Sequence, residues 1–468
     1  MRTLLLSDIL SQTGGNIIKG SGNPRIKNVK KVSKKKIKDN TLLFHLDRDQ
    51  IKGKYWSKYH SLAIISDVPN MCTDLGANIV LIEVENVEEA YWKFIEYYRN
   101  LFTIPVIGVT GTCGKTTTKE MMSQILCEEF NVESTWMSMN SKSVNLRYLT
   151  SIDDDTEVAV FEMPVCYPGY LRTACNYFKP EIRILLNIGV HHLADCNTPM
   201  EYMLAKAEIV EGLNEMDGTL ILNADDENIK KVIDVSSLQK VIYFGKNEEV
   251  EFQADHIRYG KGGMDFTLKH QDKIYKVFVP GYGEHNVYNA LAAIAAVSLV
   301  GVTIPNAIHR LAQFEQVEEH LEFKTGVNGS TVIDDTWNSS PLSMASALDV
   351  LKNVTQNKTS IALLGYMPQL GKEEYATHEY EKLGEKVVET GVDLLIIAGE
   401  EAIEIGRKAL ELGMDKNKVH FCKSGTEIYE VLQPYITEQA MILLKITHRV
   451  MKRQSYAEFK NKLILEDK

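Results

Sequence analysis

The stretch Pro105-Val-Ile-Gly-Val-Thr-Gly-Thr-Cys-Gly-Lys-Thr-Thr-Thr118 decides the fold of this chain. The residues from Val106 to Val109 predict a short buried strand, and a glycine-punctuated turn follows it. Lys115 and Thr116 then open a predicted helix that runs to about Phe130. A strand, a glycine turn and a helix N-terminus direct several backbone N–H groups to one point, where the helix dipole favours an anion.

This turn predicts a binding site for nucleotide phosphates. Gly111 and Gly114 allow the backbone to approach a phosphate, Lys115 neutralises β and γ oxygens, and the Thr116 hydroxyl is a ligand for Mg²⁺. The match to the pattern G-x-x-x-x-G-K-[ST] is incomplete, because Val109 stands at the first glycine position. An ordinary strand-turn-helix with an exposed lysine is the alternative, which the order of strand, glycines, lysine and threonine disfavours.

Composition limits the class of protein. The chain has 468 residues, which predicts about two to four domains, and its net charge of −11 argues against a nucleic-acid partner. The basic run Lys30–Lys38 is interpreted as a solvated loop or edge. Seven cysteines without a C-x-x-C pair predict a reducing compartment with free thiols. We expect a cytoplasmic protein, because no apolar run reaches about 18 residues and no signal peptide is recognisable.

Strands alternate with helices along the chain, which predicts an α/β fold with mostly parallel sheets covered on both faces. We expect an N-terminal substrate-binding domain at 1–100, a central nucleotide domain at 101–315 and a C-terminal Rossmann-like α/β domain at 316–468. An antiparallel insertion is expected at 247–280. The clearest predicted strands and helices are the strands 42–46, 62–66, 78–82, 158–162, 182–186, 218–223, 331–334, 360–364, 394–398 and 441–445, and the helices 87–100, 201–213 and 284–300.

Polar residues follow the predicted central strands, at the edge where parallel sheets bind ligands. Glu162 ends an apolar strand and offers a hard oxygen ligand for Mg²⁺; the alternative is a surface carboxylate at a strand end. His192 stands beside His191, and a histidine considered alone is more often a structural hydrogen-bonding residue than a ligand. Lys206 lies in a mostly apolar helix, where a lysine is commonly snorkelling or paired, or else a metal ligand after carbamylation by CO₂.

Several segments, in this order, resemble the Mur ligase superfamily of ATP-dependent amide-bond-forming ligases. The matching segments are Thr110–Thr118, Asn187–Leu193 followed by Ala205–Ile209, Leu222–Asp226, Gly283–Ala293 and Asp334–Met344. The last of these is similar to the D-D-x-Y-N-A-N-P segment of the MurF type, which adds D-alanyl-D-alanine to the muramoyl tripeptide. Gly365–Gly371 with His378 also follows that type.

The resemblance implies a three-domain ligase of peptidoglycan precursor synthesis that uses ATP and Mg²⁺. It implies a small-molecule carboxylate donor, such as a UDP-sugar peptide, an amine acceptor and a monomeric enzyme. Implied catalytic residues are Lys115, Glu162, His192 and Lys206, and implied metal ligands are Thr116, Glu162, His192 and carbamylated Lys206. Implied nucleotide-binding residues are Thr110, Gly111, Gly114, Lys115, Thr116, Thr117, His285, Asn286, Asn289, Asp334 and Asp335. Lys445 and His448 resemble the K-x-S-H/R element of the third domain.

The departures from the family pattern fall mostly on substrate contacts. The altered positions are Val32-Ser33-Lys34 for D-S-R, Met139–Asn145 for N-x-N-N, Glu162-Met-Pro164 for E-x-G, Glu319-His320 for G-R, Tyr366 and Gln369 for the acidic residues of G-D-M-x-E-L-G, and Ile446-Thr447 for the small residues of K-G-S. Two alternatives therefore stay open: a diverged ligase for another carboxylate and amine, and a non-catalytic nucleotide-binding paralogue. A P-loop kinase or motor ATPase is weaker, because it does not explain the spacing of His192 and Lys206.

Overall fold

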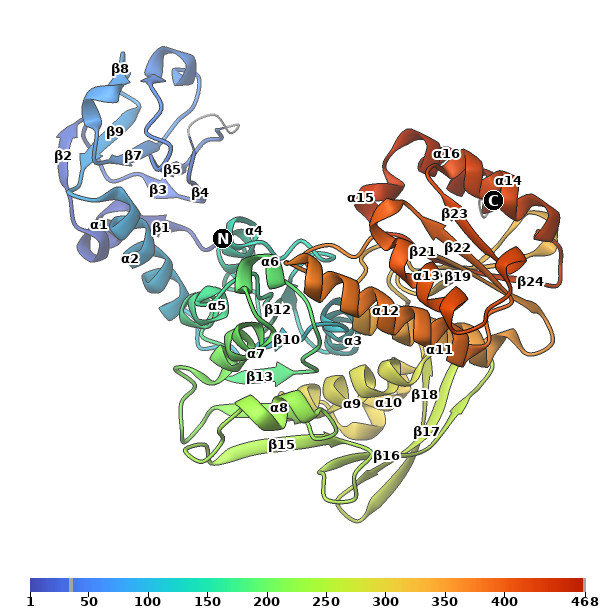
Figure 1. Ribbon diagram of the computed structural model, residues 1–468. Coiled ribbons are helices and arrows are strands. Elements are labelled where there is room, and N and C mark those ends of the chain that lie inside the picture. Colours follow the sequence, from blue (N-terminus) through green and yellow to red (C-terminus); the bar gives the residue numbers. More distant parts are fainter. Residues whose placement is uncertain (33–36, 466–468) are drawn as a thin grey trace. The chain divides into compact units, whose positions relative to one another are not determined.

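The computed structural model describes residues 1–32 and 37–465 (Figure 1). Contacts divide the chain into two compact units: Met1–Val106, Phe130–Ala159 and Asn176–Lys179 form the first, and Ile107–Glu129, Val160–Cys175 and Pro180–Lys468 form the second. The domain boundaries at 100 and 315 stay predictions. Within the described ranges, no helix combines the length and apolar character needed to cross a membrane.

The first unit contains a five-stranded sheet in the order β2-β9-β7-β5-β4, in which only β2 runs antiparallel to its neighbour. The predicted helix 87–100 is confirmed as α2. It begins after Asn86, because the Asn86 side chain caps it by accepting the backbone N–H groups of Glu88 and Glu89. The elements of this unit are β1 (Leu4–Leu5), α1 (Leu6–Thr13), β2 (Asn16–Lys19), β3 (Arg25–Ile26), β4 (Asn28–Lys30), β5 (Thr41–Phe44), β6 (Ile51–Lys52), β7 (Leu62–Ser66), β8 (Cys72–Thr73), β9 (Ile79–Glu83), α2 (Val87–Asn100), β11 (Val132–Ser134) and α4 (Lys142–Leu149).

The strands of the central sheet that lie wholly or mainly in the second unit follow the order β12-β10-β13-β14-β15-β16-β17-β18. Pairing is parallel from β10 to β16, and β16 to β18 form the antiparallel insertion predicted at 247–280 (Figure 1). Elements wholly or mainly in the second unit are β10 (Val106–Thr110), α3 (Lys115–Leu126), β12 (Val158–Glu162), α5 (Tyr170–Phe178), β13 (Ile182–Leu185), α6 (Leu193–Cys196), α7 (Pro199–Ala207), β14 (Thr219–Asn223), α8 (Glu227–Val232), β15 (Lys240–Gly245), β16 (Phe252–Tyr259), β17 (Gly263–His270), β18 (Lys273–Pro280), α9 (Glu284–Leu299) and α10 (Ile304–Leu311).

Two predicted helices differ from the structure. Helix α3 ends at Leu126 and not near Phe130. The helix expected at 201–213 begins earlier, because Thr198 caps it and Pro199 occupies its first position. It ends at Ala207 and continues only as a 3₁₀ turn, Glu208–Val210.

The C-terminal sheet of the second unit has the order β19-β20-β24-β21-β22-β23, and β19 is its antiparallel edge. Short strands β19 and β23 were not predicted, whereas the four predicted strands are confirmed. Its elements are β19 (Glu322–Thr325), β20 (Thr331–Asp334), α11 (Pro341–Thr355), β21 (Thr359–Gly365), α12 (Glu373–Thr390), β22 (Leu394–Ala398), α13 (Ile403–Glu411), β23 (Val419–Cys422), α14 (Gly425–Leu432), β24 (Ala440–Lys445), α15 (His448–Met451) and α16 (Gln454–Leu463).

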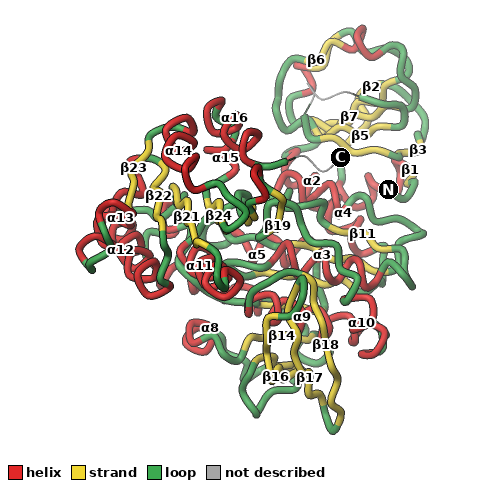
Figure 2. The backbone as a smooth tube through the Cα atoms, turned by 90° about the vertical axis from the view of Figure 1, so that its right-hand side faces the viewer, coloured by secondary structure: helices red, strands yellow, loops and turns green. Residues whose placement is uncertain are grey.

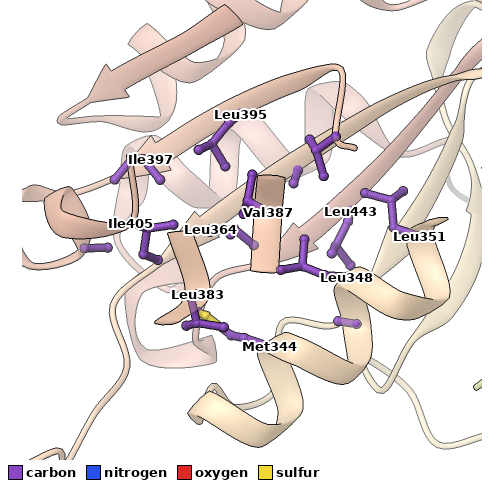
Figure 3. Close-up of a cluster of buried hydrophobic side chains, with 14 of the residues drawn as sticks. Met344, Leu348, Leu351, Leu364, Leu383, Val387, Leu395, Ile397, Ile405 and Leu443 are labelled. Carbon is purple, nitrogen blue, oxygen red and sulfur yellow. The ribbon is translucent and has the colours of Figure 1, made fainter. Parts of the chain in front are cut away.

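Alternate residues of these strands face two separate apolar clusters. Leu364 and Ile397 join the cluster under α11, α12 and α13, where Leu348 and Val387 also lie (Figure 3). Leu363 and the other alternate residues face α14 and α16, which cover the opposite face of the sheet (Figure 2). Both faces of the strands are therefore buried, as expected for parallel strands that read as continuous apolar runs.

A buried arginine fixes the segment after α7. Arg183 lies on β13 with 2% of its surface exposed. Its guanidinium donates to the carbonyl oxygens of Pro180 (3.0 Å), Ile209 (2.6 Å), Glu211 (2.8 Å) and Gly212 (3.2 Å). The Arg183 guanidinium thus supplies the hydrogen-bond donors for four carbonyl groups at helix ends and turns.

We expect Arg183→Met to destabilise the second unit by about 3 kcal/mol, because it strands several buried carbonyl groups. The change is read as a lower urea midpoint. Arg407→Met is the matched control: Arg407 is exposed and pairs with Glu404 on the same helix, so its loss should cost less than about 0.5 kcal/mol. Equal midpoints for the two variants would contradict the anchoring role.

Candidate nucleotide and metal site

The turn between β10 and α3 has the geometry of an anion-binding loop. Gly114 adopts φ 83° directly before the first turn of α3. A Cβ at Gly114 would lie 2.3 Å from Asn289 Oδ1, and Asn289 is itself buried. Glycine is therefore required here both by backbone conformation and by space. The turn ends at the N-terminus of a 12-residue helix, where backbone N–H groups and the dipole favour phosphate.

Asn187, which follows β13, holds this loop in shape. Its Oδ1 accepts the backbone N–H groups of Thr112 (3.0 Å) and Cys113 (2.9 Å), and its Nδ2 donates to the Cys113 carbonyl oxygen (3.1 Å). The sequence placed Asn187 at a strand end, but it did not assign it a role. The Asn187 side chain thus pairs with backbone N–H donors and with a backbone carbonyl acceptor of the loop.

We expect Asn187→Ala to weaken binding of Mg²⁺-ADP about tenfold, because the loop loses three hydrogen bonds that fix its conformation. Calorimetric titration measures the affinity. Asn306→Ala, at an exposed position of α10, serves as the control and should bind as the unchanged protein does. An Asn187→Ala affinity equal to that of the control would show that the loop keeps its shape without this residue.

Lys115, Thr116 and Glu162 meet at the loop as the sequence predicted. Lys115 Nζ donates to the carbonyl oxygens of Gly111 (3.0 Å) and Thr112 (3.1 Å). The Thr116 hydroxyl donates to Glu162 Oε2 at 2.9 Å, and both side chains are buried. A hydroxyl and a carboxylate oxygen side by side are the hard donors that Mg²⁺ prefers.

Lys206 also reaches the loop. It is 1% exposed, and its Nζ donates to the Thr110 hydroxyl (3.2 Å) and to the Gly111 carbonyl oxygen (2.8 Å). Burial, and after it the charge of Lys115, lowers the pKa of Lys206 well below its usual value. The neutral amine that this favours is the form that reacts with CO₂.

His191 and His192 follow β13 and pack edge to face, with ring centroids 4.2 Å apart. Burial lowers the pKa of His191 to about 3, and burial with the neighbouring His191 lowers the pKa of His192 to about 2. Both rings are therefore neutral near pH 7. Across residues 1–32 and 37–465, His191 Nε2 and His192 Nδ1 are buried without a hydrogen-bond partner. A neutral imidazole can bind a metal through its unprotonated nitrogen.

The metal donors do not form a cluster of the common kind. Within the described residues, no three His, Cys, Asp or Glu side chains come together as a group that could hold a metal ion. A set made of Thr116, Glu162, His192 and carbamylated Lys206 draws on other donor types, and it stays a prediction. Ser33 and Lys34 of the departure at Val32-Ser33-Lys34 lie outside the described residues.

A cavity of about 680 Å³ opens beside the loop, and its size is typical of a small-molecule site. Predicted nucleotide residues that line it are Gly114, Thr117, His285, Asn286, Asn289 and Asp335, while Thr110, Gly111, Lys115 and Thr116 belong to the adjoining loop. Asn286 Nδ2 donates to the carbonyl oxygens of Pro280 (2.7 Å) and Gly281 (3.1 Å), which fixes the start of α9. Burial lowers the pKa of His285.

The neighbours Asp334 and Asp335 have different surroundings. Asp335 lines the cavity and pairs with Lys445 Nζ at 2.6 Å. Asp334 is fully buried and pairs with Lys460 Nζ at 2.9 Å. His448, the other residue of the predicted C-terminal element, pairs with Glu319 at 3.1 Å. Asp335 is thus placed to contact a ligand, whereas Asp334 anchors the strand that carries it.

Some cavity residues were not assigned from the sequence. Asp225 and Asp226 line the cavity after β14. The Tyr288 hydroxyl donates to Asp225 Oδ2 at 2.7 Å, and Asp226 accepts the Ile188 N–H at 2.9 Å while capping α8. The segment Leu222–Asp226 was noted in the sequence, but strand-end position alone does not distinguish a ligand contact from a helix cap.

Comparisons with known proteins agree with this geometry. The Mur ligase middle domain matches residues 109–297, and the Mur ligase glutamate ligase domain matches 321–445. UDP-N-acetylmuramoyl-tripeptide--D-alanyl-D-alanine ligase of Bacillus subtilis (strain 168) is 27% identical over 368 residues, which cover 79% of this chain and 78% of the relative. The same-named ligase of Rickettsia prowazekii (strain Madrid E) is 30% identical over 305 residues, 64% of this chain and 67% of the relative.

Solved structures show the same fold. MurF from Acinetobacter baumannii superposes with a TM-score of 0.82 at 22% identity and covers 98% of this chain and 99% of its own. MurF ligase from Thermotoga maritima in complex with ADP gives 0.76 at 22% identity, with 93% and 97% covered. The predicted α/β fold is confirmed, and the chain belongs to the Mur ligase family.

Proposed function

We propose that this chain is an ATP-dependent ligase that joins UDP-N-acetylmuramoyl-tripeptide to D-alanyl-D-alanine in peptidoglycan precursor synthesis. The observation that carries the proposal is the meeting of Lys115, the Thr116–Glu162 pair and Lys206 at one loop beside a nucleotide-sized cavity. The names of the relatives, which match over most of the chain, support the substrates.

The chemistry requires activation of a carboxylate. Transfer of the γ-phosphoryl group of ATP to a carboxylate oxygen gives ADP and an acyl phosphate. The amine nitrogen attacks the acyl carbon, the tetrahedral intermediate expels inorganic phosphate, and the nitrogen loses a proton. The protein's task is to position the reactants, to neutralise charge and to exclude water from the acyl phosphate.

Each loop residue has a distinct part in this proposal. Lys115, which now bonds to loop carbonyls, turns to the β and γ oxygens and stabilises their charge. Thr116, Glu162, His192 and carbamylated Lys206 would hold Mg²⁺, which neutralises phosphate oxygens when bound. The remaining contacts fall to the loop, to α9 and to the residue after β20: Thr110, Gly111, Gly114 and Thr117 at the phosphates, His285, Asn286 and Asn289 on the adenine side, and Asp335, supported by Asp334, at the ribose.

The proposal extends to the organisation of the chain. Residues 1–100 would bind the sugar nucleotide, 101–315 the ATP, and 316–468 the amine side while closing on the nucleotide. A reaction that consumes ATP and a UDP-linked precursor belongs in the cytoplasm, and we propose a monomer, which size-exclusion chromatography with light scattering tests. The exposed residue Met139 begins the segment Met139–Asn145, in which the family's N-x-N-N element is altered.

The altered substrate contacts favour a second candidate, a ligase for a different carboxylate and amine. Tyr366 and Gln369 replace acidic residues of the family pattern. Gln369 adopts φ 63°, and its carbonyl oxygen accepts the Leu193 N–H at 2.8 Å. The Gln369 backbone is thus hydrogen-bonded to Leu193, the residue after His192, whereas the side chains at 366 and 369 are no longer acidic.

Phosphate release distinguishes the candidates. Purified protein with Mg²⁺-ATP is given UDP-N-acetylmuramoyl-tripeptide and D-alanyl-D-alanine, together and singly, and the product is identified by mass. Release only with both substrates supports the first proposal. Release with the tripeptide but another dipeptide or amine supports the second. Tight ADP binding without any product across a donor–acceptor panel would indicate a non-catalytic paralogue.

A further inference from the structure

Tyr202 connects three parts of the site, although neither the sequence pattern nor the proposed function assigns it a role. It lies on α7 one helical turn before Lys206, so both side chains project from the same helix face. Its side chain is 1% exposed and is one of the largest that the structure buries fully.

The hydroxyl end of Tyr202 reaches the phosphate loop. Its oxygen lies 3.3 Å from Thr112 Oγ1, and one of the two hydroxyls donates to the other. Thr112 Oγ1 also accepts the Gly189 N–H at 2.8 Å. Burial raises the pKa of Tyr202, so its hydroxyl keeps its proton for this bond. The loop, the segment after β13 and α7 are thereby joined through two side-chain oxygens.

The ring of Tyr202 touches the predicted metal ligands. Lys206 Nζ lies 5.5 Å from the ring centroid, above its face. The His192 ring stacks on Tyr202 with centroids 6.1 Å apart and an interplanar angle of 23°. His192 itself has φ 52°, a left-handed conformation that needs support from its surroundings. A rigid aromatic ring beside both side chains limits the positions that each can adopt.

We propose that Tyr202 is a positioning residue, which holds the phosphate loop through Thr112 and fixes Lys206 and His192 beside its ring for nucleotide binding. This rests on the proposed function, because it assigns the loop to nucleotide phosphates. A tyrosine that only filled the core would need the ring but not the hydroxyl bond to the loop. The hydroxyl therefore separates positioning from packing.

Tyr202→Phe removes only the hydroxyl and keeps the ring. We expect Mg²⁺-ADP, titrated into the purified full-length protein in a calorimeter, to bind about fivefold to tenfold more weakly. Tyr98→Phe is the control: the buried Tyr98 hydroxyl accepts the Arg2 N–H (2.8 Å) and donates to the Ile152 carbonyl oxygen (2.5 Å), and all three residues belong to the first unit, whereas the loop belongs to the second. Its ADP affinity should stay unchanged, while both variants lose comparable thermal stability.

A double-mutant cycle makes the test independent of general destabilisation. In a Thr112→Val background, Tyr202→Phe should weaken ADP binding by less than about twofold, since the partner oxygen is already gone. Additive losses, or wild-type affinity in Tyr202→Phe itself, would overturn the proposal. These measurements need no ligation: a protein that binds ADP with this Tyr202 dependence but joins no substrates refutes the proposed function alone.

Discussion

Lys115→Ala should lower ligation by at least about a thousandfold, the largest effect expected of any single substitution in this chain. The ammonium is the one lysine charge carried by the phosphate loop itself, and it already bonds to the Gly111 and Thr112 carbonyl oxygens that border the site. Without it, charge on the transferring phosphoryl group loses its fixed partner. The measurement is phosphate release under saturating substrates, with product mass as confirmation.

The control for Lys115 is Lys230→Ala. Lys230 is exposed on α8 and pairs with Glu227 three residues before it. Turnover should stay within about twofold of the unchanged protein, as for most surface substitutions. Persistent ligation in Lys115→Ala, with Lys230→Ala equally active, would remove the loop from the mechanism.

Lys206→Ala should reduce turnover about a hundredfold to a thousandfold, because it removes the buried lysine at the loop whose neutral amine carbamylation would turn into an anion. Short carboxylic acids such as acetate or formate should restore part of the activity by occupying the vacated space. In the unchanged protein, added bicarbonate should raise turnover, and mass spectrometry under native conditions should detect the added CO₂.

Lys206→Met separates charge from packing. Methionine fills most of the space of the buried lysine side chain without its nitrogen, so the fold should persist while activity falls as in Lys206→Ala. Carboxylic acids should rescue Lys206→Met less than Lys206→Ala, because the methionine occupies the space that they need. Equal rescue of both variants, or full activity without rescue, would rule out a carbamate ligand.

Much of the site could be predicted from the sequence because its residues follow directly on strands. Glu162 ends β12 and Lys115 begins α3, so the alternation of apolar runs and polar residues located them. The strand 158–162 was predicted with the bounds that β12 has. Parallel strands bring such residues to one sheet edge whatever the details of the loops.

Other features depend on contacts that no local pattern encodes. The sequence does not distinguish the roles of Asp334 and Asp335. Only the structure separates them, because Asp334 pairs with Lys460 and Asp335 pairs with Lys445. Tyr202 reads as one more apolar helix residue until its hydroxyl is seen beside Thr112. The segment after α7 is likewise held by a distant residue, because the Arg183 guanidinium donates to the carbonyl oxygens of Ile209 and Glu211.

The parallel direction of the central strands has a practical consequence at the sheet edge where the strands begin, opposite the cavity. The exposed turn Asn214–Asp217 precedes β14, and Asn214 holds it by accepting the N–H groups of Met216 (2.9 Å) and Asp217 (3.1 Å). The five-residue strand β14, about 16 Å long, begins after this turn and ends at Asn223, which lines the cavity. A peptide epitope or a fluorescent reporter inserted between Met216 and Asp217 would therefore leave the chemistry untouched, which offers a handle for surface immobilisation.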